Sequence, residues 1–215
     1  MDHPDGSLTW VMVRHGETEW TEARRIHGRL DRPLSERGRW QASRAAKRLS
    51  GQAFDALYTS AQGRAMETAA TLGRAVGLTP RPLDGLQEYD FGWLEGMPLP
   101  AFSPAYIGPR TLRPIVHMMM RLSAEGDRRF SRRVRGALDE LVARHPAGRV
   151  LIVTHWVVLS QTLIELVAGN GANWREYGPW AACGLTELRR TGGRWSLVAA
   201  NDAAHLLVPG DGMRP

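Results

Sequence analysis

The 215-residue sequence contains very little cysteine and lysine. Cys183 is the only cysteine, so no disulfide can form within the chain, and no Cys/His cluster has zinc-ligand spacing. A single thiol is typical of a reducing compartment, so we expect a cytoplasmic protein. Lys47 is the only lysine and lies in no glycine-rich loop, which excludes the P-loop nucleotide triphosphatases.

Long apolar runs are also absent. No stretch approaches the roughly 20 apolar residues that cross a bilayer, so we expect no membrane partner. The first eight residues are polar and lack the apolar segment of a secretory signal peptide.

Positive charge is abundant, with a formal net charge of +6 that is carried almost entirely by arginine. The excess is consistent with attraction of anionic substrates, and equally with a compositional bias of the genome. Its densest part, 128–135, carries Phe130 and Val134 at helical spacing. This pattern indicates the solvated face of an amphipathic helix rather than a nucleic-acid site, so we expect no nucleic-acid partner.

Short apolar segments alternate with amphipathic ones along the chain, which predicts alternating strands and helices. Strands are expected at 10–13, 54–58, 78–83 and 149–153, and a closing hairpin at 185–189 and 195–199. Helices are expected after Ser35 as N-cap, after Ser60 with Gly77 as its stop, around 130–141 and at 157–167. Segments 19–33 and 86–114 are expected to be loops, and 115–122 a short helix.

This alternation favours the α/β class, as a three-layer α/β/α sandwich with a mainly parallel central sheet. No repeat or linker is visible, so 1–215 is expected to be one domain, with 86–130 as a lid-like insert. Long segments without regular structure are usually functional or disordered. Six apolar residues are candidates for such a lid or for ordinary core packing: Trp93, Phe102, Tyr106, Met118, Met119 and Met120.

Two strand ends carry a histidine. Arg14, His15 and Gly16 follow the first strand, and His155 follows the strand at 149–153. Ligands of open α/β sheets bind beyond the carboxyl ends of the strands, so neighbouring strands would bring both imidazoles together. Arg64 lies one turn into the helix after the second strand, and helix N-termini offer free N–H groups to anions. The pattern predicts two histidines and two arginines around one phosphate.

Further motifs run along nearly the whole chain. They are Arg14-His15-Gly16-Glu17-Thr18, Glu19-Trp20, Arg25-Ile26, Gly28, Leu34-Ser35-Glu36-Arg37-Gly38, Gln41-Ala42, Tyr58-Thr59-Ser60, Arg64-Ala65, Glu67-Thr68-Ala69, Leu86-Gln87-Glu88, Phe91-Gly92, Glu95-Gly96, Arg133-Val134, Val153-Thr154-His155, Asn201-Asp202 and His205-Leu206. With these motifs, in this order, the chain resembles the histidine phosphatase superfamily, the phosphoglycerate mutase-like proteins.

The resemblance implies a catalytic set of His15, Glu88 and His155. His15 would be the nucleophile that carries a transient phosphohistidine. Arg14, Arg64 and His155 would hold the phosphoryl oxygens, and Glu88 would protonate the leaving oxygen and then activate water. The family uses no metal and no cofactor for this step, its substrate would be a small-molecule phosphate ester, and its members are often homodimers.

Three positions depart from the family pattern. Thr21 replaces a phosphate-binding asparagine, and its hydroxyl reaches less far. His27 replaces a glutamine. Trp156 replaces a glycine whose backbone N–H lies near the ligand, so its own N–H is expected to face the phosphate. The indole of Trp156 would fill the core, or it would lie at the mouth of the site and favour aromatic esters.

The segment between Gly96 and Arg133 is comparatively short. Mutases of the family carry a longer insert that keeps water out, so the sequence favours a phosphomonoesterase. The alternatives are a phosphoglycerate mutase-type phosphotransferase, or a binding or regulatory protein of the same fold whose activity has decayed.

Overall fold

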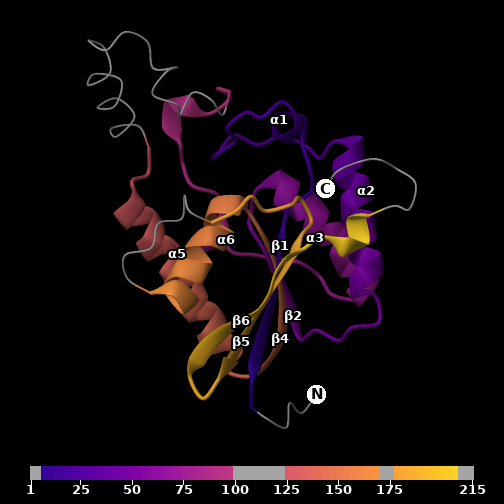
Figure 1. Ribbon diagram of the computed structural model, residues 1–215, viewed down its shortest axis with the longest axis vertical. Helices are drawn as coiled ribbons and strands as arrows, with labels where there is room; N and C mark the ends of the chain where they lie inside the picture. Colours follow the sequence, from indigo (N-terminus) through magenta and orange to yellow (C-terminus); the bar gives the residue numbers. More distant parts are fainter. Residues whose placement is uncertain (1–5, 99–123, 170–176, 208–215) are drawn as a thin grey trace.

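The protein was analysed as a computed structural model, which describes residues 6–98, 124–169 and 177–207. Four parallel strands make up one part of a six-stranded sheet, whose strand order is β3-β2-β4-β1-β5-β6; Figure 1 shows this sheet between the helices. The parallel strands are β1 (Leu8–Arg14), β2 (Ala56–Thr59), β3 (Arg81–Pro82) and β4 (Gly148–Thr154). β1 and β4 are parallel neighbours, as predicted.

The other two strands extend the sheet in the antiparallel sense. β5 (Leu185–Thr191) pairs with β1, and β6 (Arg194–Asp202) completes the predicted hairpin at the sheet edge. The sheet is therefore mainly parallel, with its two antiparallel strands at one edge.

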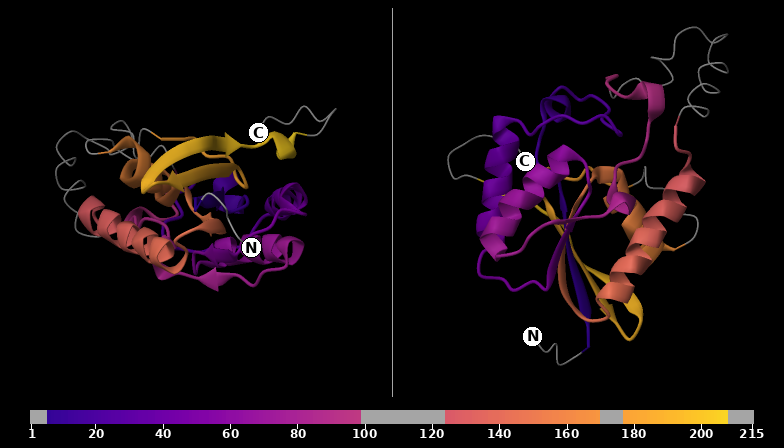
Figure 2. Two further views of the ribbon diagram at one scale, coloured as in Figure 1. Left: turned by 90° about the horizontal axis from the view of Figure 1, so that it is seen from below. Right: turned by 180° about the vertical axis from the view of Figure 1, so that it is seen from behind.

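Helices cover both faces of the sheet. α2 (Glu36–Leu49) and α3 (Gly63–Val76) lie on one side of the strands, and α5 (Asp127–Arg144) lies on the other (Figure 2). α6 (Trp156–Leu163) shares the apolar cluster of α5 and continues into a π-helical turn, Ile164–Ala168. Trp10 and Met12 of β1 join that cluster, whereas Val11 and Val13 join the α2–α3 cluster. This alternation produces the predicted three-layer sandwich.

The helix boundaries follow from local signals. The hydroxyl of Ser35 caps α2 by accepting the N–H of Gly38 at 3.0 Å, and Ala42, Ala45 and Leu49 are buried on one face. α3 ends at Gly77, whose φ of 73° is in the left-handed region that glycine tolerates. The predicted Ser35 cap and Gly77 stop are both confirmed.

Several segments differ from the sequence-based expectation. The supposed loop 19–33 contains a short helix, α1 (Glu19–Glu22), which begins at a capping box formed by Thr18 and Thr21. The strand expected at 78–83 is reduced to Arg81–Pro82, because prolines lack the N–H that a strand ladder needs. The last described part of the chain adds a 3₁₀ turn, Ala204–Leu206.

The insert is described only in part. Segment 86–98 contains the 3₁₀ turn Gly92–Leu94, after a first turn at Asp84–Leu86. Trp93 is exposed there, at 42%. The predicted helix 115–122 and the lid candidates Phe102, Tyr106 and Met118 to Met120 lie outside the described residues. Among the residues that are described, no helix is both long and apolar enough to cross a membrane.

Candidate active site

The sheet register brings the two histidines together. Val13 is paired with Val153 and Arg14 with Thr154, so both strands end at the same edge. The N–H of His15 donates to the carbonyl of Thr154 at 2.9 Å. Both imidazoles are buried, and their ring centroids lie 5.1 Å apart. The predicted convergence of His15 and His155 is what the structure shows.

The hydrogen bonds of His15 define which nitrogen is available. Its Nδ1 lies 2.7 Å from the carbonyl oxygen of Gly16, which can only accept, so Nδ1 carries the proton. Nε2 is then unprotonated and accepts from Nε of Arg64 at 3.3 Å. Burial, followed by the charges of Arg64 and Arg14, lowers the pKa of His15 well below its usual value. The imidazole is therefore neutral and presents a lone pair to a guanidinium.

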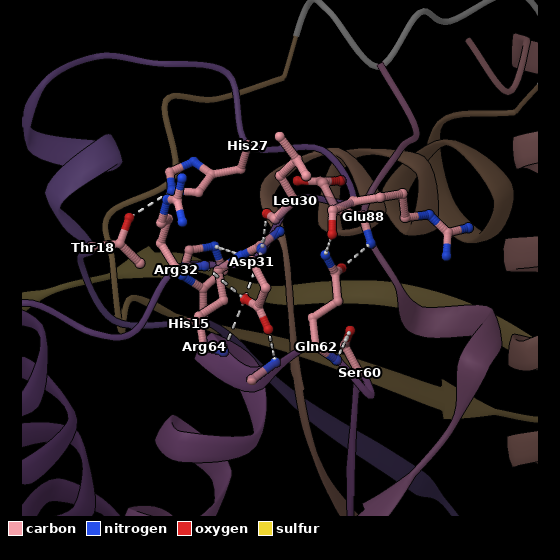
Figure 3. A network of polar contacts seen from close by, with 12 residues as sticks. His15, Thr18, His27, Leu30, Asp31, Arg32, Ser60, Gln62, Arg64 and Glu88 are labelled. Carbon is pink, nitrogen blue, oxygen red and sulfur yellow. Dashed lines mark hydrogen bonds and ion pairs between the residues drawn. The ribbon is translucent and has the colours of Figure 1, made fainter. Parts of the chain in front are cut away.

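Arg64 is fully buried and is held by the segment that precedes α2 (Figure 3). Its Nη2 donates to the carbonyl of Gly28 at 2.9 Å, and its Nη1 donates to the carbonyl of Leu30 at 3.0 Å. Nη1 also pairs with Oδ1 of Asp31 at 3.1 Å. These contacts leave Nε directed at His15.

Asp31 also occupies the N-terminus of α3. Its carboxylate accepts the backbone N–H groups of Gly63 and Arg64. The expected free N–H groups of this helix are thus already bonded, which corrects the prediction that they are open to an anion. Asp31 was not singled out from the sequence, because it lies in a polar segment without periodicity.

Arg14 has one buried donor without a partner. Its Nη1 donates to the carbonyl of Trp180 at 2.5 Å, and its guanidinium carbon lies 5.2 Å from the ring centroid of Trp156. Nε is buried and has no hydrogen-bond partner among the described residues. Burial lowers the pKa of Arg14 to about 10, at which it stays cationic near neutral pH. An unpaired buried N–H of this kind is suited to a phosphoryl oxygen.

His155 offers a second such group. Its Nε2 lies 2.8 Å from Oγ of Ser60, while its Nδ1 is buried without a partner among the described residues. When Ser60 donates to Nε2, Nδ1 carries a proton that it can give to an oxyanion. Burial, followed by the charge of Arg64, lowers the pKa of His155 well below its usual value.

Glu88 reaches the same sheet edge from the segment after the first 3₁₀ turn. It is only 6% exposed. Its carboxyl oxygens accept the N–H of Tyr89 at 2.9 Å and the N–H of Val157 at 3.3 Å. Burial raises the pKa of Glu88, and the Tyr89 N–H and Arg64 only partly oppose this. A buried carboxyl with a raised pKa can donate a proton at a higher pH than an ordinary glutamate.

Arg133 of α5 holds the segment that carries Glu88. It donates to the carbonyls of Gly85 at 2.9 Å, Gln87 at 2.8 Å and Glu88 at 3.3 Å. Both carboxylate oxygens of Glu125 accept from the same guanidinium, at 2.7 and 2.8 Å. The position of Glu88 therefore depends on a helix that begins about forty residues later in the chain.

Thr21 and His27 both contact Thr18. The hydroxyl of Thr21 accepts the Thr18 N–H at 3.3 Å as part of the capping box, and its role in phosphate binding stays a prediction. Nε2 of His27 lies 2.5 Å from Oγ1 of Thr18, and the His27 ring centroid is 6.1 Å from that of His15. Burial and Arg64 lower the pKa of His27 to about 3, so this imidazole is neutral.

Trp156 supports Arg14 rather than only filling the core. Its half-buried indole lies against the Arg14 guanidinium, and its Nε1 donates to the carbonyl of Tyr177 at 3.1 Å. A Cβ at Gly178 would lie 2.7 Å from the indole, so this side chain fits only because residue 178 is glycine. The phosphate contact expected of the Trp156 backbone stays a prediction.

A Trp156→Leu variant is therefore expected to raise the KM for phosphate esters about fivefold, since a cation–π contact contributes roughly 1 kcal/mol. The turnover number should change less. Steady-state kinetics with small and aromatic esters, together with thermal unfolding, test this, and Trp40→Leu on the exposed side of α2 is the control. A loss confined to aromatic esters would instead place the indole at the mouth of the site. Strong destabilisation with an unchanged KM would make it core filling.

The histidines also predict how stability depends on pH. The five histidines in the described segments all have lowered pKa values: His15, His27, His145, His155 and His205. Below about pH 6.5 the unfolded chain binds more protons at these sites than the folded chain, so the fold becomes less stable as the pH falls. Glu88 has the opposite effect on stability. Its raised pKa means that the folded chain binds this proton more tightly than the unfolded chain, so protonation of Glu88 stabilises the fold as the pH falls.

We therefore expect the free energy of unfolding to decrease from about pH 7 to about pH 5. Urea unfolding at the two values measures the difference, and His27→Gln should make it smaller. An unchanged difference in that variant would show that His27 does not titrate as described.

No group of three or more His, Cys, Asp or Glu side chains arranged to hold a metal ion occurs in 6–98, 124–169 or 177–207.

Comparison with known proteins gives a consistent result. The model of the histidine phosphatase superfamily (branch 1) matches residues 10–203. A protein named probable phosphoglycerate mutase GpmB, of Yersinia pestis (strain Pestoides F), is 31% identical over 217 residues, which cover 94% of this chain and 96% of that protein. Among solved structures, Bacillus stearothermophilus YhfR is 28% identical with a TM-score of 0.77, covering 93% of this chain and 100% of that one. A mycobacterial glucosyl-3-phosphoglycerate phosphatase is 27% identical with a TM-score of 0.77, covering 92% and 100%.

Proposed function

Because the chain belongs to the histidine phosphatase superfamily (branch 1), whose members are phosphatases or mutases, we propose that it is a phosphomonoesterase that acts on small phosphorylated metabolites. The proposed reaction passes through a phosphohistidine and uses no metal. The proposed setting is the cytoplasm, on the basis of the single cysteine.

In the first step the hydrogen bond from Nε of Arg64 to Nε2 of His15 breaks, and the freed lone pair of Nε2 attacks the phosphorus atom. A P–N bond forms while the P–O bond of the ester breaks, and the carboxyl proton of Glu88 passes to the departing oxygen. Arg14, Arg64 and His155 stabilise the charge on the equatorial oxygens, which is the main protein contribution to phosphoryl transfer. The products are an alcohol and the phosphohistidine.

In the second step water attacks the same phosphorus atom. Glu88, now a carboxylate, takes the proton of the water, and the P–N bond breaks. Inorganic phosphate leaves, and both His15 and Glu88 return to their starting protonation states. One residue acting first as acid and then as base requires a pKa that lies near the working pH.

One observation carries the proposal: the unprotonated Nε2 of a buried, neutral His15 is directed at Arg64. A neutral imidazole next to a fixed cation is suited to attack an anion, because the cation attracts the phosphoryl group without protonating the nucleophile. The buried Glu88 and the unpaired donors of Arg14 and His155 supply the remaining roles.

Hydrolysis is preferred to mutase activity because the segment between Gly96 and Arg133 is short. Sequence similarity leaves both reactions open: the relative from Yersinia pestis is named a probable mutase, and the mycobacterial neighbour is a phosphatase. A mutase would retain its phosphoryl group, whereas a phosphatase must admit water to the phosphohistidine.

The deciding experiment measures phosphate release from p-nitrophenyl phosphate and from a panel of metabolites, with no bisphosphate added. A phosphatase releases phosphate from several of them. A mutase requires a bisphosphate primer and interconverts phosphoglycerates, and a decayed member of the fold does neither. Absence of both hydrolysis and phosphohistidine formation would refute the proposal.

A further inference from the structure

The short segment 60–64 contacts three of the proposed catalytic residues. Ser60 bonds to His155, and Arg64 bonds to His15, as described above. Between them lies Gln62, which bonds to Glu88 (Figure 3). Every second side chain of this segment thus bonds to a different one of the three proposed catalytic residues.

Gln62 is a buried polar residue, only 7% exposed. Its Oε1 accepts the backbone N–H of Glu88 at 2.8 Å. Its Nε2 donates to the carbonyl of Gly28 at 2.9 Å, with a longer contact of 3.4 Å to the carbonyl of Arg29. The amide thus uses both ends, and it joins segments that lie 26 and 34 residues away in the chain.

Gly28 connects Gln62 to the phosphate side of the site. Its carbonyl oxygen accepts from Gln62 and also from Nη2 of Arg64, at 2.9 Å in both cases. Arg64 and Gln62 are therefore bonded to the same oxygen, and Gln62 is bonded in turn to Glu88. These bonds connect the position of Glu88 to that of Arg64.

The side chain of Gln62 does not cap the helix that the residue precedes. Gln62 is the N-cap residue of α3, but its side chain makes no capping hydrogen bond, and Asp31 takes the first N–H groups instead. Burying an amide is costly unless both of its ends are bonded, so an apolar residue would satisfy packing more simply. The presence of a polar side chain at position 62 is explained by the two segments that it connects, at Gly28 and at Glu88.

We infer that Gln62 is a positioning residue for proton transfer, which sets the Glu88 carboxyl relative to the phosphoryl group held by Arg64. This inference rests on the proposed function. Glu88 must reach the leaving oxygen within hydrogen-bond distance, and a displacement of about 1 Å can cost about 100-fold in rate. Loss of Gln62 therefore affects proton donation more than phosphate binding.

The test uses three variants of the full chain. Gln62→Met keeps the length and most of the volume of the side chain but removes both hydrogen bonds. Gln62→Glu keeps an acceptor for the Glu88 N–H and loses the donor to Gly28. Gln52→Met is the matched control, since the side chain of Gln52 bonds only to Arg48 and Arg149 among the described residues, and Gln52 lies before β2, away from the site.

Each variant is assayed for phosphorylation in a single turnover with p-nitrophenyl phosphate and with an alkyl phosphate. For Gln62→Met we expect a loss of about 10- to 100-fold with the alkyl ester, which needs a proton on its leaving oxygen. The loss with p-nitrophenyl phosphate should be under about threefold, because nitrophenolate departs without that proton. With the alkyl ester, the phosphorylation rate of Gln62→Glu should lie between those of Gln62→Met and the unaltered chain. The rates of Gln52→Met should equal those of the unaltered chain.

The pH profile supplies a second readout. In Gln62→Met the high-pH limb of kcat/KM, which reports the Glu88 proton in the free enzyme, should shift relative to the unaltered chain. An equal loss for both esters with an unshifted limb would reduce Gln62 to a structural role and overturn the inference, as would full activity with the alkyl ester. If the unaltered chain itself forms no phosphohistidine and hydrolyses neither ester, the proposed function fails instead, and thermal unfolding identifies a variant that has not folded.

Discussion

Replacing His15 with alanine is expected to abolish turnover while the fold remains. The imidazole supplies the attacking nitrogen, and neither Arg64 nor His155 can replace it, because one is a permanent cation and the other has its Nε2 bonded to Ser60. Without the nucleophile no phosphoryl-enzyme forms, so the reaction loses its two-step route.

The loss of His15 should have little effect on stability at neutral pH. The side chain makes one hydrogen bond to its neighbour Gly16 and one to Arg64, and the strand before it is held by pairing with β4 and β5. At about pH 5 the variant should be less destabilised relative to pH 7 than the unaltered chain, because one lowered histidine pKa has been removed.

The measurements are phosphate release, acid-labile labelling of the protein by radioactive phosphate ester, and circular dichroism. His145→Ala is the histidine control, since His145 contacts Tyr58 at the end of α5 and not the site. A folded His15→Ala protein that keeps more than a small fraction of the activity, or that still becomes labelled, would show that another residue is the nucleophile.

Glu88→Gln should lower turnover by about 10²- to 10⁴-fold for esters with poor leaving groups, because an amide cannot give up a proton as a carboxyl does. Esters such as p-nitrophenyl phosphate should lose less in the formation of the phosphohistidine. Their hydrolysis in the steady state should still be slow, since the same residue activates water in the second step.

Glu88→Gln should also change how kcat/KM depends on pH. Glu88 must be protonated to act first, and its raised pKa keeps it so to a higher pH than an ordinary glutamate. In the unaltered enzyme, kcat/KM should fall as the pH rises through that pKa, and in Glu88→Gln this limb should disappear. At low pH both proteins should lose activity as His15 becomes protonated. This happens at a lower pH than for an ordinary histidine, because the pKa of His15 is lowered.

Single-turnover rates across a series of leaving groups, measured over the pH range, test the assignment. Glu140→Gln, on a partly exposed ion pair of α5, is the carboxylate control. A loss of equal size for every leaving group, with the high-pH limb retained, would contradict the role of Glu88 as the acid.

The sequence by itself determined where the two strands that precede His15 and His155 end, and which residues follow them. The apolar run before Arg14 and the one before Thr154 are local patterns, and parallel neighbouring strands place their ends at one edge whatever the details of packing. The same holds for Ser35 and Gly77, since caps depend on residues within one turn. The convergence of His15, Arg64 and His155 was therefore predictable.

Only the tertiary structure decided how these side chains are held. Asp31 reaches Arg64 across 33 residues, Gln62 reaches Glu88 across 26, and the N–H of Val157 reaches Glu88 across 69. Each is an ordinary polar residue or backbone group, and no periodicity links it to its partner. Trp156 shows the same limit: its place beside Arg14 depends on the room left at Gly178, which is a property of packing between distant segments.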